Sequence, residues 1–204
     1  MTHRLTRRRV LAVGTATALA AVAGCASGSA SDDTTTTTTT ADSPTEHGHG
    51  GGHETMPSSP SSSAEVAMVS GSDGHHFDPH VVWVEPGGTV TWVNESGSHT
   101  STAYHPDNSD HPRRIPAAAD AWDSGLFTAS GATYEHTFTE PGVYDYYCAP
   151  HEGVGMIGSV VVGEPDPHDQ AGLAAPDSSL PGHVREKLME LNGMVDEMLG
   201  HHHD

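Results

Sequence analysis

The chain has few basic residues and few cysteines. Its 204 residues include eight Lys and Arg against 27 Asp and Glu, and the formal net charge is −19. Four of the eight basic residues are arginines within the first nine positions, so the rest of the chain has four basic residues against 27 acidic ones. A surface this acidic repels phosphate backbones, which argues against nucleic acid as a partner. Two cysteines, Cys25 and Cys148, are too few for a disulfide framework.

Aromatic residues are also scarce, and all eleven lie between Phe77 and Tyr147. The packed core is therefore expected in that part of the chain. Segment 25–63 has no aromatic residue and includes an unbroken threonine run at 34–40. It cannot bury enough apolar surface to fold, so we predict a disordered tether. Histidine, by contrast, is abundant, with 17 residues. His47, His49 and His53 in the tether are candidate accessory metal ligands or simply solvated sequence, and His201, His202 and His203 near the end are a second candidate metal tract or a cloning remnant.

Residues 1–24 have the pattern of an export signal. A basic stretch at 6–9 precedes an apolar run at 10–23 that is short for a membrane-spanning helix. The arginine pair resembles a twin-arginine signal, which exports folded proteins, and Val22-Ala23-Gly24-Cys25 resembles a lipobox. We therefore expect a lipid on Cys25 that holds the protein on the extracytoplasmic face of the cell membrane. An uncleaved anchor helix is the alternative, and it gives the same location.

Segment 64–163 is rich in Val, Thr and aromatic residues, interrupted every 8–12 residues by Gly, Pro, Asn or Asp. This composition and this spacing of turn residues are typical of an all-β sandwich or barrel. We expect strands at 65–69, 81–84, 89–93, 134–138, 143–148 and 157–162, with Pro-Gly turns at 85–88 and 140–142. Alternation within 143–148 places Tyr144, Tyr146 and Cys148 on one face.

The end of that strand carries a set of soft metal ligands. Cys148, His151 and Met156 supply a thiolate, an imidazole and a thioether within nine residues. Blue-copper sites use two His and one Cys with a weak axial Met, so a second His has to come from elsewhere. His99 follows the strand ending at Asn94 and is the favoured candidate. The alternatives for this ligand are His105 and His111 in the same connection, and His75, His76 and His80 upstream.

The loop 148–156 resembles that of plastocyanins, which run Cys-x-Pro-His-x-Gly-x-Gly-Met with the same spacing. The pattern Phe77-x-Pro79, followed by Thr89-Val90-x-Trp92-x-Asn94, is similar to the opening of the cupredoxin fold. Signal, threonine tether and acidic excess together are similar to halocyanins, plastocyanin-like proteins of salt-loving archaea.

This resemblance implies a cupredoxin-like Greek-key β-sandwich or barrel over 64–163. It implies one type 1 copper held by His99, Cys148 and His151, with Met156 as axial ligand, and Asn94 and Thr100 close to the site. The implied function is an electron carrier, not an enzyme, that passes single electrons between membrane-bound redox proteins. Because of the histidine tracts, an extracytoplasmic copper storage or delivery protein is the alternative.

A linker at 164–180 leads to a predicted helix and His tail at 181–204. An apolar stripe recurs at spacings of 4, 3, 4 and 3 residues and consists of Val184, Leu188, Leu191, Val195 and Met198. This spacing is typical of an amphipathic helix. We expect the stripe to pack on the β domain, with self-association or a partner protein through helix 181–199 as the alternative.

Overall fold

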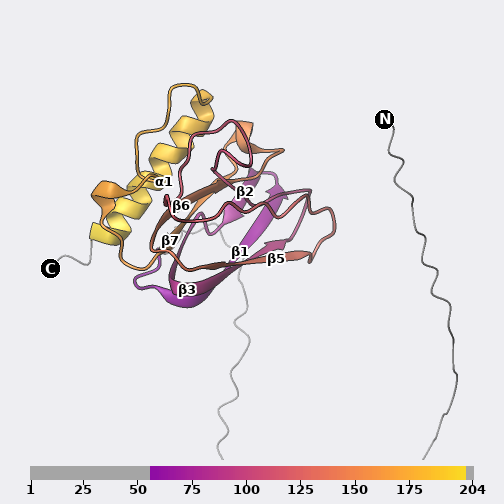
Figure 1. Ribbon diagram of the computed structural model, residues 1–204. Coiled ribbons are helices and arrows are strands. Elements are labelled where there is room, and N and C mark those ends of the chain that lie inside the picture. Colours follow the sequence, from indigo (N-terminus) through magenta and orange to yellow (C-terminus); the bar gives the residue numbers. More distant parts are fainter. Residues whose placement is uncertain (1–55, 201–204) are drawn as a thin grey trace, which may run out of the picture. The chain divides into compact units, whose positions relative to one another are not determined.

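The computed structural model describes residues 56–200 (Figure 1). Within that range lie seven strands: β1 (Ser61–Gly71), β2 (Gly74–Asp78), β3 (Val81–Asn94), β4 (Thr102–Ala103), β5 (Thr133–Phe138), β6 (Gly142–Tyr147) and β7 (Ile157–Val162). Two short 3-10 helices, η1 (Glu152–Val154) and η2 (Pro167–Asp169), and one α-helix, α1 (Gly182–Gly200), complete the described elements. The predicted signal peptide, most of the tether and both histidine tracts lie outside the described residues.

The strands run in the order β2-β1-β3-β7-β6-β4, and β5 pairs with β3. β3 is parallel to β1 and β7, whereas its pairing with β5 is antiparallel. Its first part, at 81–84, pairs with β7, and its second part, at 88–93, pairs with β5. One long strand thus serves both layers of a β-sandwich. The expected all-β fold with one C-terminal helix is confirmed.

One expected turn is wrong. Residues 85–88 were predicted to separate two strands, but β3 continues through them. Both flanks stay parallel to β1, with Val84 opposite Ser61 and Thr89 opposite Ser63, so the chain does not reverse direction. The extra residues of β3 form a bulge, which Gly87 permits because its φ of 87° is readily adopted only by glycine.

Strands β6 and β7 are buried at every position, because they are covered on both faces. On one face Tyr144, Tyr146 and Cys148 join the core between the sandwich layers, as their alternation predicted. On the other face Val143 and Tyr147 pack in a second cluster with α1. The helix therefore completes a core that the strands alone would leave exposed.

Helix α1 lies alongside β7 (Figure 1), also contacts β3, and shares an apolar cluster with side chains of β6. All five residues of the apolar stripe are buried, with at most 3% of any of them exposed. The stripe thus packs on the β domain, which is the first of the two expectations. Any self-association would need another face of the helix. None of the helices among residues 56–200 is long and apolar enough to cross a membrane.

We expect Leu188→Ala to lower the free energy of unfolding by about 2–5 kcal/mol, because it leaves a cavity under a fully buried helix position. Chemical denaturation of the purified protein measures the change. Met189→Ala is the matched control, since the Met189 side chain is 55% exposed and its loss should change the free energy of unfolding by less than about 0.5 kcal/mol. Equal effects of the two substitutions would show that α1 does not pack through this stripe.

Candidate metal centre

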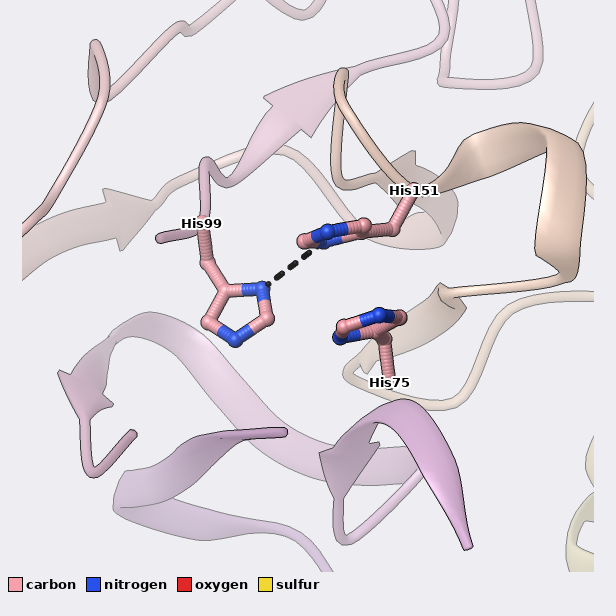
Figure 2. Close-up of side chains that lie close together, drawn as sticks. All are labelled: His75, His99 and His151. Carbon is pink, nitrogen blue, oxygen red and sulfur yellow. Dashed lines mark hydrogen bonds between the residues drawn. The ribbon is translucent and has the colours of Figure 1, made fainter. Parts of the chain in front are cut away.

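Three side chains from two parts of the chain converge at the end of β6. Cys148 follows that strand, His151 lies three residues further on, and His99 comes from the connection between β3 and β4. The Cys148 Sγ lies 3.5 Å from His99 Nδ1 and 3.4 Å from His151 Nδ1. The two nitrogens, joined by the dashed line in Figure 2, are 3.2 Å apart. Three atoms with these separations lie about 2 Å from a common point, which is the length of a bond between an imidazole nitrogen and zinc. The donor set therefore fits a single soft or borderline metal ion.

Backbone hydrogen bonds fold the loop after Cys148 back on itself. The Cys148 N–H donates to the Met156 carbonyl at 3.0 Å, and the Met156 N–H donates to the His151 carbonyl at 3.2 Å. Gly155, with a φ of 89°, ends η1 in a left-handed conformation. Met156 thereby returns beside Cys148, and its side chain is fully buried in the same core cluster.

The thiol is supported by Thr100, one of the two residues expected near the site. The Thr100 N–H points at Cys148 Sγ at 3.4 Å, and the Thr100 hydroxyl oxygen accepts from the Ala149 N–H at 2.8 Å. Asn94, the other, is fully buried and donates through Nδ2 to the carbonyls of Gly97 and Ala129. Asn94 thus fixes the connection that carries His99.

Burial sets the protonation of these groups in the metal-free protein. It raises the pKa of the Cys148 thiol, although the backbone N–H groups of Thr100 and His151 oppose the rise. It lowers the pKa of His99 and of His151, and neighbouring imidazoles add to the lowering in both. Neutral imidazoles can accept a metal ion directly, whereas the thiol has to lose its proton first. Metal binding is therefore coupled to release of a proton.

His75 belongs to the same group of side chains. From the sequence it was considered only as an alternative to His99 for the second histidine ligand. Its ring stacks on that of His151 with centroids 3.7 Å apart and planes 6° apart, and the imidazoles of His75, His99 and His151 form a cluster of donors within 4.8 Å (Figure 2). Its Nδ1 is 2.7 Å from Ser70 Oγ. No strong pattern in the sequence indicates this arrangement, because β2, which carries His75, was not predicted.

Ser96 and Ser70 together hold the His99 ring. The His99 Nε2 lies 2.8 Å from the Ser96 carbonyl oxygen and 2.9 Å from Ser70 Oγ. A carbonyl oxygen only accepts, so Nε2 carries the ring hydrogen and Nδ1 keeps its lone pair. That lone pair is on the nitrogen that faces Cys148, as a metal ligand requires.

The remaining histidines considered for the second ligand lie elsewhere. His105 Nδ1 accepts from the Asp107 N–H at 3.0 Å, and His111 Nε2 is 2.9 Å from a Glu152 oxygen. The rings of His76 and His80 lie near each other, with centroids 6.1 Å apart. Among the described residues, His99 is thus the candidate whose nitrogen lies against Cys148.

Glu152 anchors the loop 148–156 to the long connection 103–127. One of its carboxylate oxygens accepts from the Tyr104 hydroxyl at 2.7 Å, and the other lies 2.9 Å from His111 Nε2. Burial and the neighbouring Glu152 raise the pKa of Tyr104, so its hydroxyl keeps the hydrogen that it donates. Glu152, the residue next to His151, is therefore held through both of its carboxylate oxygens.

A β-sandwich that places two imidazole nitrogens and one thiol sulfur around a common point is typical of a protein that binds a single metal ion. The family model for copper binding proteins of the plastocyanin/azurin family matches residues 64–163. Plastocyanin from Lactuca sativa is 36% identical over 104 residues, which are 48% of this chain and 99% of the relative. The chloroplastic major isoform from Arabidopsis thaliana is 33% identical over 99 residues, 48% of this chain and 58% of the relative.

A solved pseudoazurin from Sinorhizobium meliloti superposes with a TM-score of 0.50 and 28% identity, covering 67% of this chain and 98% of the pseudoazurin. The chain therefore belongs to the plastocyanin/azurin family of copper-binding proteins. The family binds one type 1 copper, and the histidine cluster with Cys148 fits such a site. The expected cofactor is confirmed, and so is the plastocyanin-like resemblance at the level of the family.

Proposed function

We propose that the protein is a blue-copper electron carrier in which His99, Cys148, His151 and Met156 would hold the copper. One observation carries the proposal: a thiol sulfur and two Nδ1 atoms separated by 3.2 to 3.5 Å at the end of a buried strand. Copper bound there supplies one electron at a time by alternating between Cu(I) and Cu(II).

The contribution of the protein is to hold the ligands still. The Ser96 carbonyl fixes the His99 ring, and the Thr100 N–H faces the Cys148 sulfur. Tyr104 and His111 hold Glu152, the residue after His151. Ligands that cannot relax keep the same geometry in both oxidation states, so an electron moves with little rearrangement.

The exposure of the two imidazoles differs and favours one route for the electron. His99 is fully buried, whereas His151 is partly exposed. Beside His151 lie exposed Pro150 and Val154, the latter with 67% of its side chain accessible. An apolar surface around a partly exposed ligand suits brief contact with a redox protein, and we assign electron entry and exit to this edge.

The test uses the purified protein loaded with one equivalent of Cu(II). An intense visible band from thiolate-to-copper charge transfer is expected, together with bleaching by a mild reductant and recovery on reoxidation. The rival function is copper storage or delivery, which the abundance of histidine favours. A colourless protein that holds several equivalents of Cu(I) would replace the carrier with that function.

We further propose a halocyanin-type lipoprotein, exported by a twin-arginine signal and anchored at Cys25, whose donors and acceptors are redox proteins of the same membrane. The support is in the sequence: the signal pattern, the lipobox-like Val22-Ala23-Gly24-Cys25 and the acidic excess, which keeps a protein hydrated in concentrated salt. Cys25→Ser is expected to move the protein from the membrane fraction to the soluble fraction of the producing cells. Retention of the variant in the membrane fraction would disprove the lipid anchor.

A further inference from the structure

A cleft of about 550 Å³ lies beside the copper centre, between the β1–β2 hairpin, the loop 148–156 and α1. Its walls carry four imidazoles and several carboxylates, from residues that include Asp73, His75, His76, His80, His183 and Glu186. Lys187 also lines the cleft, but its ammonium group pairs with Glu190 at 2.9 Å. Imidazole and carboxylate together are the ligands that Cu(II) and Zn(II) accept in proteins.

The cleft and the copper centre share one wall. His75 lines the cleft and also stacks on His151, with ring centroids 3.7 Å apart. Val154 and Gly155, from the loop that carries His151, line the cleft as well. A cation in the cleft is therefore separated from the copper ligands by a single layer of imidazole.

The copper ligands themselves are difficult to reach from water. Cys148 and His99 are fully buried, so an aquated ion has no direct approach to the sulfur. His183, in the first turn of α1, is exposed, and His76 is partly exposed. The ring centroids of His76 and His80 lie 6.1 Å apart. Two imidazoles at this separation can both bind the same ion through bonds of about 2 Å.

We propose that this cleft is a second, weaker copper site, which holds an incoming ion before it passes to Cys148, His99 and His151. The inference rests on the proposed function. Within residues 56–200, His75, His99 and His151 are the three donors that lie within 4.8 Å of one another, and the donors of the cleft are more widely spaced. Wide spacing suits an ion that has to leave again.

The transfer needs no oxidant or reductant. An ion in the cleft exchanges water and imidazole ligands for His151 and His99, and its oxidation state does not change. In the last step the Cys148 S–H bond breaks, the sulfur binds the ion, and the proton goes to water.

The first test measures the rate of loading. One equivalent of aqueous Cu(II) is mixed with the metal-free full chain, and growth of the visible band is followed by stopped flow. We expect the double variant His76→Ala/His183→Ala to slow the growth about tenfold and to reach the same final intensity, because neither residue belongs to the copper ligand set. His168→Ala is the control, since His168 is exposed and lies outside the cleft lining.

An unchanged rate in a double variant that reaches the full band would overturn the proposal. So would a slower rate only when His201, His202 and His203 are replaced by Ala, because the tail would then be the entry point. The absence of a band in the parent protein would instead disprove the proposed electron carrier.

The second test measures binding directly. A protein in which the six tract histidines are replaced by Ala is first filled with one copper and then titrated with a second equivalent of Cu(II). Electron paramagnetic resonance is expected to show a second signal without thiolate character. The His76→Ala/His183→Ala variant should bind that second ion at least about tenfold more weakly. Equal affinities in the two proteins would show that the cleft holds no copper.

Discussion

Replacing Cys148 with Ser is expected to abolish the intense visible band of the copper-loaded protein. The band requires a thiolate bound to Cu(II), and a serine hydroxyl neither ionises near neutral pH nor offers a soft, polarisable donor. The two histidines stay in place, so the variant still binds Cu(II), but more weakly and with the pale colour of nitrogen and oxygen ligands. Reversible one-electron chemistry is lost with the band.

The fold should survive this substitution. Cys148 is fully buried, but the Thr100 N–H that faces its sulfur at 3.4 Å can donate to a serine oxygen instead. We expect the free energy of unfolding to change by about 1 kcal/mol. The measurement is the visible spectrum after one equivalent of Cu(II), with thermal melting as the test of folding. Cys25→Ser, which changes the other cysteine, should keep the full band, and a band that persists in Cys148→Ser would refute the ligand assignment.

Much of this site could be predicted because three of its residues are local in the sequence. Cys148, His151 and Met156 lie on one strand end and one loop, so their spacing alone brings them together. His99 comes from a distant connection, and its place after the strand ending at Asn94 favoured it over five other histidines, a choice that the resemblance supported. His75 and Ser70 could not be assigned, because their roles depend on a hairpin that gives a weak pattern and on a ring contact made across the fold.

Much of the fold could likewise be predicted from the sequence. The last strand was predicted with its observed bounds, Ile157–Val162, and the helix to within one residue at each end. What alternation could not show is that β6 is buried on both faces, since that depends on α1 packing against the sheet. One signal was present: Asp145 stands in an otherwise apolar and aromatic strand, and a charge in a buried strand requires a partner.

That partner is Arg114, and the pair joins five parts of the chain. The Arg114 Nε donates to Asp145 Oδ2 at 2.6 Å, and both side chains are at most 3% exposed. The same guanidinium donates to the carbonyls of Gly172 and Ala174 in the linker. Through Asn192 Oδ1, at 3.3 Å, it also reaches α1. The second oxygen of Asp145 accepts from the Ser159 hydroxyl at 2.6 Å.

Arg114→Met is therefore expected to lower the free energy of unfolding by about 3–5 kcal/mol, because it leaves a buried carboxylate without its cation. Burial already raises the pKa of Asp145, against the opposing effects of Arg114 and Ser159. Without the arginine the folded carboxyl binds its proton still more tightly than the unfolded one. Above the usual pKa of an aspartate the folded state then holds more protons than the unfolded state, so the stability of the variant falls as the pH rises.

Chemical denaturation at mildly acidic and at neutral pH measures both effects, and two variants separate the buried charge from other causes. Arg113→Met removes the neighbouring arginine, whose side chain makes a single hydrogen bond among residues 56–200, a long one of 3.4 Å to the Pro116 carbonyl. This substitution should change the free energy of unfolding by less than about 1 kcal/mol. Arg114→Met/Asp145→Asn removes the lone charge and should recover part of the loss. If the double variant is as unstable as Arg114→Met at neutral pH, the hydrogen bonds to the linker and α1, and not the ion pair, hold these parts together.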